Sequence, residues 1–169
     1  FIPELIKDLF TAQNKEALDS GISRARYMLQ QAASLDLTVN QSGNNIVAVV
    51  RVTNETGHKL PSGYPEGRRI WINLKARDNG GAVIYESGHY DAANATLTSD
   101  GDSKIYQIKP GMDAVIAGVT GNTEGPSFHF VLNNKIFYDN RIPPSGFTNA
   151  AFTAIQSPPV GYTYNDGQY

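Results

Sequence analysis

A long connection rich in glycine and proline joins two strand-like runs of this chain and limits how those runs can pair. The first run, Ile46 to Val52, is mostly β-branched, and the second begins at Ile70. The connection between them, Asn54 to Trp71, is far too long for a tight hairpin turn. A connection of this length inside a compact domain is usually either a functional loop or a sign that the neighbouring elements are wrongly assigned. We predict a functional loop here, with its one histidine, His58, as the chemical centre.

Two segments that precede the strand-like runs have sequence features typical of helices. Pro3 to Phe10 is predicted to form a short helix, because proline suits the first turn. A second helix is predicted from about Lys15 to Ala33, with Asn14 as its N-cap. One apolar face with helical spacing supports it: Leu18, Ile22, Ala25, Leu29 and Ala32.

The apolar period then changes to two, which is typical of strands. Leu35, Leu37 and Val39 alternate with polar residues, and Asn40 to Asn45 is rich in turn-forming residues. Ile46 to Val52 is predicted to be a central strand that is apolar on both faces.

Further strands are separated by turns rich in Gly, Asn and Asp. Ile70 to Arg77 and Ala82 to Glu86 are predicted to form a hairpin around the turn Asp78-Asn79-Gly80-Gly81. The remaining predicted strands are Lys104 to Ile108 and Ser127 to Leu132, with weaker patterns at Asp113 to Val119 and Lys135 to Asp139. Short strands at this spacing indicate a mainly β chain that forms an antiparallel, Ig-like β-sandwich.

The predicted organisation has three parts. One or two helices form a connector over residues 1–34, the β-sandwich covers 35–140, and an irregular Pro-rich tail over 141–169 wraps over a surface. Neither end reads as natural, so we expect a processed chain or a piece of a larger protein.

Composition excludes several classes of function. A net charge of -2 gives no electrostatic reason to expect binding to nucleic acid, and no apolar run approaches the length of a membrane span. The absence of cysteine excludes disulfides, thiolate catalysis and Cys-ligated metal sites. It also excludes a Cys-x-x-Cys-His site for covalent haem in this chain.

Several blocks of the sequence resemble one family. Thr56 to Arg69 resembles the signature of the C-terminal β-sandwich region of bacterial and archaeal multihaem c-type cytochromes. Gly125 to Asn134 and Asp139 to Asn149 are similar to further blocks of that region. Two closing segments, Pro159 to Tyr162 and Asp166 to Tyr169, complete a resemblance that covers nearly the whole chain.

The resemblance implies an accessory or capping domain of an extracytoplasmic electron-transfer protein, in the periplasm or outside the cell. Its partner would be a haem-bearing cytochrome segment or subunit. Family members carry Cys-x-x-Cys-His sites upstream, and this chain has none. Haem c would therefore be bound covalently by another segment or chain. A redox-silent sandwich that serves assembly, adhesion or subunit contact, including oligomer formation, is the alternative.

Three residues of the loop are candidates for cofactor binding. His58 is the candidate axial ligand to haem iron, since imidazole commonly ligates iron in multihaem cytochromes. The alternative is that His58 bonds backbone carbonyls and shapes the loop. Arg68 and Arg69 face opposite sides of a strand, so only one of them can pair with a haem propionate or with Glu66. A purely structural role is the alternative for both arginines.

Other polar residues suggest less specific sites. His89 and His129 share no metal-ligand spacing, so ordinary hydrogen-bonded or exposed imidazoles are the simpler expectation. Asp91, Asp100 and Asp102 lie in one loop and make calcium a weak alternative. The sequence contains no nucleophile, metalloprotease or phosphate-binding motif, so we expect no catalytic activity of its own.

Overall fold

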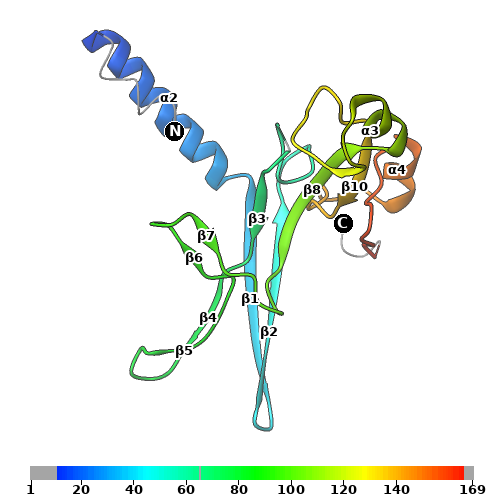
Figure 1. Cartoon of the computed structure of the whole chain (residues 1–169). Coiled ribbons are helices and arrows are strands. Elements are labelled where there is room, and N and C mark those ends of the chain that lie inside the picture. The colour runs from blue at the N-terminus through cyan, green and yellow to red at the C-terminus, as the bar shows by residue number, and fades with distance from the viewer. Residues whose placement is uncertain (1–10, 65, 166–169) are drawn as a thin grey trace. The chain divides into compact units, whose positions relative to one another are not determined.

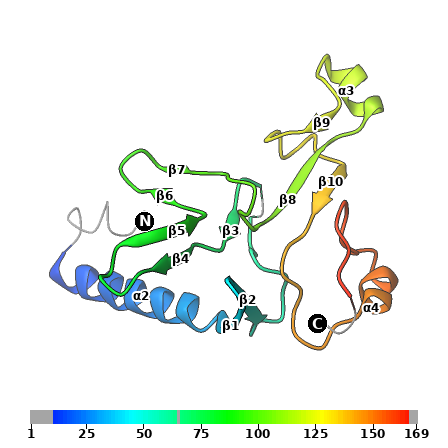
Figure 2. The same ribbon diagram turned by 90° about the horizontal axis from the view of Figure 1, so that it is seen from below.

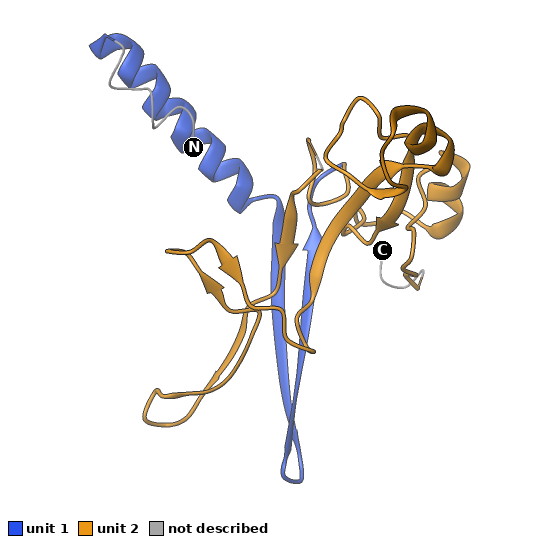
Figure 3. Cartoon of the chain, in the orientation of Figure 1, with its two compact units in different colours: residues 1–57 blue, residues 58–169 orange. Residues whose placement is uncertain are grey.

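The computed structural model describes residues 11–64 and 66–165, and strands outnumber helices among them (Figure 1). The strands form small antiparallel sheets, which confirms the mainly β prediction. The chain divides into two compact units, residues 1–57 and 58–169 (Figure 3). The division falls between Gly57 and His58, inside the predicted functional loop. The predicted segments 1–34, 35–140 and 141–169 stay a prediction, and the helix predicted at Pro3 to Phe10 lies outside the described residues.

Helix α2, Ala12–Gln30, leads unit 1. Its N-cap is Thr11, whose Oγ1 accepts a long hydrogen bond of 3.5 Å from the backbone N–H of Asn14. The prediction of Asn14 as the cap is wrong, because the Thr11 hydroxyl can cap the helix one turn earlier. Ile22 is buried as the helical pattern predicted, whereas Leu29 is exposed.

A long two-stranded hairpin completes unit 1. Strands β1 (Ala33–Ser42) and β2 (Asn45–Asn54) pair antiparallel without a bulge, from Ala33 opposite Asn54 to Ser42 opposite Asn45. The turn is only Gly43-Asn44, narrower than the predicted Asn40 to Asn45, and Gly43 has a φ of 60°. Glycine adopts this left-handed conformation without the steric cost that a Cβ would bring.

The register divides the side chains of the hairpin between its two faces. One face carries Leu35, Leu37, Val39, Ile46, Ala48, Val50 and Val52. Among the residues that the structure describes, β2 pairs only with β1, so the prediction of a central strand is wrong. The run of β-branched residues fixed the strand conformation but did not specify a second neighbour.

Strand β8 (Ile105–Met112) is the centre of the main sheet of unit 2. It pairs antiparallel with β3 (Arg69–Trp71) and with β10 (Lys135–Asp139), in the order β10-β8-β3. The short strand β9 (Gly125–Pro126) pairs with the end of β8. The strands predicted at Lys104 to Ile108 and Lys135 to Asp139 are therefore confirmed.

Two hairpins follow β3 along the chain. Strands β4 (Leu74–Arg77) and β5 (Val83–Ser87) lie side by side (Figures 1 and 2) and flank the predicted turn. Asp78 Oδ1 accepts hydrogen bonds of 2.9 Å from the N–H groups of Gly80 and Ala82, which holds this turn closed. Strands β6 (Tyr90–Asp91) and β7 (Thr96–Leu97) form the second, shorter hairpin.

Two predicted strands of unit 2 are wrong. Asp113 to Val119 contains helix α3 (Ala114–Thr120), because Asp113 Oδ1 caps it by accepting from the N–H of Ile116 over 2.9 Å. Ser127 to Leu132 is a turn rather than a strand. There the Ser127 hydroxyl accepts from the N–H of His129 over 2.9 Å, and such local bonds compete with a strand ladder.

The segment after β10 packs into unit 2 through backbone bridges. Ile142 bridges Leu60, and Val160 bridges Asp139. Helix α4 (Asn149–Ala154) is capped by Thr148. The buried apolar side chains of unit 2 come from the loop, β8, α3 and this segment: Leu60, Ile108, Met112, Ala117, Ile142, Phe152 and Tyr164. Over the described part of the chain, no helix is long and apolar enough to cross a membrane.

The pairing of β8 with β9 requires a glycine, which yields a stability prediction. A Cβ at Gly111 would overlap the carbonyl oxygen of Gly125 in β9. We expect Gly111→Ala to lower the free energy of unfolding by about 1–3 kcal/mol, the usual cost of overpacking. Gly101→Ala is the control, because a Cβ there meets no atom within 4 Å. Urea denaturation that ranks the two variants as equally stable would contradict this pairing.

Candidate functional site

The candidate site lies at the start of the loop that leads to β3. His58 is exposed, whereas Lys59, Leu60 and Pro61 are buried directly after it. The N–H of Leu60 donates to the Ile142 carbonyl over 2.9 Å, and the N–H of Ile142 donates back over 2.8 Å. The Leu60–Pro61 peptide bond is cis. The backbone two residues past His58 is therefore tied to a segment far away in sequence.

Lys59 anchors the loop through its side chain. Its Nζ lies 3.1 Å from Asp139 Oδ2 and also donates to the carbonyl of Ser157. The ammonium group stacks over the ring of Phe152, 4.8 Å from the ring centroid. Only 7% of the Lys59 side chain and 5% of the Asp139 side chain are exposed, so solvent screens this pair very little.

Arg141 completes a three-residue ionic cluster. Its Nε donates to Asp139 Oδ1 and its Nη2 to Asp139 Oδ2, each over 2.9 Å. This is the bidentate geometry in which a guanidinium binds a carboxylate most strongly. One buried carboxylate therefore lies between two cations.

The cluster perturbs the acidity of its members in ways that geometry explains. Burial opposes ionisation of Asp139, but the hydrogen bonds and charges of Arg141 and Lys59 outweigh it and lower the pKa of the carboxyl group below its usual value. Burial lowers the pKa of the Lys59 ammonium, and the charge of Asp139 opposes that shift. At neutral pH, Asp139 is therefore ionised beside its two cations.

Asn140 links the cluster to β8. Its Nδ2 donates to the Ile105 carbonyl and its Oδ1 accepts from the N–H of Gln107, both over 2.8 Å. The hydroxyl of Tyr164 donates to the Asn140 carbonyl over 2.7 Å, and burial raises the pKa of that hydroxyl. The buried side chain of Asn140 thus exchanges hydrogen bonds with the main chain of β8.

The two arginines of the loop lie apart from this cluster of charges. Arg68 Nη1 donates to the carbonyl of Ser62 over 2.9 Å, next to Gly63, whose φ is 79°. Arg69 is exposed on β3, opposite Gln107 of β8. The bond of Arg68 to Ser62 joins two parts of the loop, and the two roles considered for both arginines, cofactor binding and a purely structural role, stay predictions.

The other two histidines occupy unrelated positions. His89 is exposed, with Nδ1 3.0 Å from Glu86 Oε1. Glu86 also accepts from Asn73 and pairs with Lys75, and these hydrogen bonds lower its pKa to about 2. His129 is exposed in the turn after β9.

The acids considered for calcium are each engaged in local hydrogen bonds. Asp91 accepts from the N–H of Ala93, Asp100 from the N–H of Gly88, and Asp102 from the hydroxyl of Tyr85. Within the described ranges, no group of three His, Cys, Asp or Glu side chains is arranged to hold a metal ion. A haem ligand, by contrast, needs only a single imidazole from this chain.

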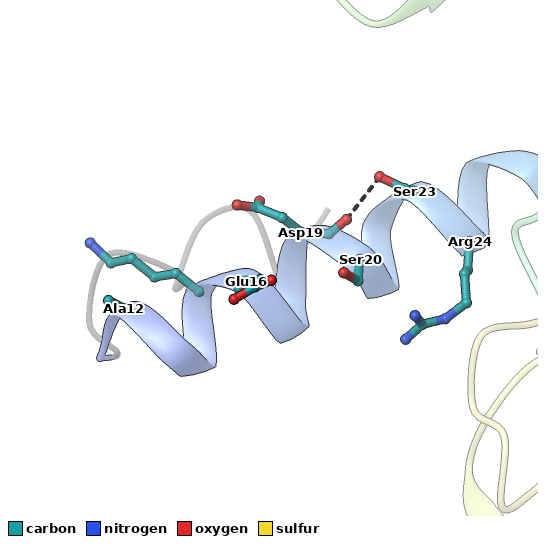
Figure 4. Close-up of a pocket in the computed structure, with 7 residues that line it drawn as sticks. Ala12, Glu16, Asp19, Ser20, Ser23 and Arg24 are labelled. Carbon is teal, nitrogen blue, oxygen red and sulfur yellow. Dashed lines mark hydrogen bonds between the residues drawn. The ribbon is translucent and has the colours of Figure 1, made fainter.

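A further hollow lies along α2 in unit 1 (Figure 4). It measures about 700 Å³, and its described lining comes from this helix alone: Ala12, Lys15, Glu16, Asp19, Ser20, Ser23 and Arg24. The hydroxyl of Ser23 donates to the Asp19 carbonyl over 2.9 Å. A hollow on one helix does not bring polar groups from several elements together, which a specific binding site requires.

Sequence reasoning singled out His58, whose predicted role stays a prediction, and missed the residues that fix the loop next to it. Lys59, Asp139 and Arg141 form the buried cluster, although Lys59 and Asp139 are 80 positions apart. A lysine followed by Leu60-Pro61 was a weak local signal of burial. Nothing local identified Asp139 as its partner.

No family model, no curated protein and no solved structure matches this chain.

The buried ion pair predicts a large stability difference between two lysines. We expect Lys59→Ala to lower the free energy of unfolding by about 3–5 kcal/mol, because removing one partner of a buried pair disrupts the whole arrangement. Lys135→Ala is the matched control, since the Lys135–Glu124 bridge is exposed on both sides and should cost less than about 1 kcal/mol. Urea denaturation of both variants measures the difference, and similar small losses would contradict a structural role for Lys59.

The lowered pKa of Asp139 predicts acid sensitivity. A carboxyl group with a lowered pKa in the folded state stabilises the fold above its unfolded pKa of about 4, and this contribution is lost as the pH falls through the folded value. We expect Asp139→Asn to be less stable than the wild type at pH 6 and to lose less additional stability by pH 3. Chemical denaturation across this range is the measurement. Parallel pH profiles of the two proteins would show that Asp139 titrates normally.

Proposed function

We propose that this chain is an accessory or capping module of an extracytoplasmic multihaem cytochrome. It lies beside haem groups that another segment or chain binds covalently, and it offers His58 as an axial ligand to one haem iron. The observation that carries this proposal is the exposed His58, placed directly before a buried, ion-paired Lys59. An exposed imidazole next to a fixed backbone is suited to binding an iron outside its own fold.

The residues of this chain could contribute one axial ligand and charge compensation to a haem, but no covalent attachment. Without cysteine this sequence cannot attach a haem covalently, so the haem would be held by another segment or chain. When bound, the haem supplies the one-electron chemistry. This chain would supply a nitrogen ligand from His58 and charge compensation for a propionate from Arg68 or Arg69.

The arrangement of the sequence blocks supports the proposed relationship. Lys59 of the first block, Asp139 to Ile142 of the third and Val160 of the fourth bond to one another within unit 2. Sequence blocks that belong to one family signature are expected to contact one another in the folded domain. The Ig-like sandwich and the wrapping tail remain part of the proposal, and so does the location outside the cytoplasm.

A second candidate function has its own observation. The apolar face of the β1–β2 hairpin is widely exposed, with 64% of Leu35 and 70% of Ile46 accessible. A two-stranded hairpin is marginally stable alone in water, so this face favours contact with another surface. A redox-silent module for assembly, adhesion or subunit contact would use it, without any need for His58.

A haem whose iron has one vacant axial position can distinguish the two proposed functions by experiment. The probe is a soluble c-type haem peptide whose own histidine fills one axial position of the iron. We expect the full chain to convert it to the low-spin spectrum of two axial imidazoles, because His58 fills the open position.

The controls compare the three histidines. His58→Ala should abolish the spectral change, whereas His89→Ala and His129→Ala, which alter equally exposed imidazoles, should leave it intact. Equal loss in all three variants, or none in His58→Ala, would refute the ligand role and favour the redox-silent module.

A further inference from the structure

A pocket of about 280 Å³ lies beside β8 within unit 2. Three segments line it: residues 66–68 before β3, residues 107–110 of β8, and residues 126–128 at and after β9. The pocket therefore brings together two of the sequence blocks, the loop that contains His58 and the turn that contains His129.

The pocket coincides with a break between two strand ladders. The pairing of β3 with β8 ends at Arg69 opposite Gln107, and the pairing of β9 with β8 begins at Gly111 opposite Pro126. Ile108 to Pro110 lie between the two ladders.

The backbone hydrogen bonds of β8 alternate between its two edges beside the pocket. The N–H of Gln107 donates to Asn140 Oδ1 over 2.8 Å, and its carbonyl accepts from the Asn140 N–H over 3.2 Å. Successive residues of a paired strand direct these groups to opposite edges, so the N–H and carbonyl of Ile108 point to the edge where β3 and β9 lie. The carbonyl of Pro110 accepts there from the N–H of Ser127 over 3.0 Å. The N–H of Ile108 therefore faces the backbone of Arg68, directly before β3.

The side chains around the pocket combine positive charge with an apolar surface. Arg68 and Lys109 outnumber Glu66, which leaves one net positive charge. A guanidinium has five N–H donors, and the hydrogen bond of Arg68 to Ser62 uses Nη1. The apolar lining comes from Ile108, Pro110, Pro126 and Phe128.

Close packing at one wall requires a glycine. Gly67 has a φ of 78°, and a Cβ there would lie 3.0 Å from Cε1 of Phe128. The aromatic ring thus packs directly against the backbone of the loop, which gives the pocket a defined wall.

We propose that this pocket binds a carboxylate carried on a short apolar stem. Arg68 and Lys109 supply the positive charge, and Phe128 with the two prolines covers the stem. A free short-chain carboxylate and a haem propionate share this chemistry. The second source rests on the proposed function, and the first does not.

Butyrate is the probe, and the uncharged isostere butyramide is its control. In amide NMR spectra of the full chain we expect saturable shifts at Gly67, Ile108 and Ser127 with butyrate and none with butyramide. Lys109→Gln and Arg68→Gln should each weaken butyrate binding about tenfold, as expected for loss of a charge-assisted hydrogen bond. Lys75→Gln, which removes an exposed lysine outside the pocket, should bind butyrate like the wild type.

The outcomes separate this site from the proposed function. Equal shifts with butyramide, or binding that Lys109→Gln leaves unchanged, would overturn the pocket assignment. If butyrate also displaces the haem peptide, a propionate is the source. If butyrate binds in the pocket without displacing it, the source is a free carboxylate. Failure of the haem peptide to bind would defeat the haem proposal alone, since the butyrate result does not depend on haem.

Discussion

The buried cluster of Lys59, Asp139 and Arg141 is the interaction on which the rest of unit 2 depends. Transferring charges out of water is costly, and the cost is offset only when each charge meets a partner in good geometry. Here one carboxylate accepts from two cations, and Lys59 also donates to the carbonyl of Ser157. The cluster therefore joins the loop, the end of β10 and the segment after α4 at one point.

Two adjacent residues of the loop have opposite environments as a result. The backbone of Lys59 and Leu60 is held by the ion pair and by the bridge to Ile142, whereas His58 is exposed. This combination places the exposed imidazole of His58 next to a backbone that is already ordered, which would lower the entropic cost of the proposed ligand role. The same loop continues past Gly67 to the pocket beside β8, so one connection contributes to both proposed binding sites.

Local patterns predicted much of the fold, and their failures share a cause. The β4–β5 turn was predicted correctly because Asp78 and the following glycines determine it locally. The strand predicted at Ser127 to Leu132 failed because the hydroxyl of Ser127 bonds the backbone two residues on. The strand predicted at Asp113 to Val119 failed because Asp113 caps a helix. Alternation of apolar and polar residues could not outweigh these short-range hydrogen bonds.

The sequence by itself determined the mainly β character and the absence of any Cys-linked haem site in this chain. Each of these follows from residue identity or from contacts between near neighbours. Only the tertiary structure decided that Lys59 is buried against Asp139 and Arg141, that Arg68 bonds Ser62, and that a pocket opens between β3 and β9. The burial of a charge and the end of a strand ladder both depend on residues far away in sequence. A local sequence pattern does not identify those distant partners.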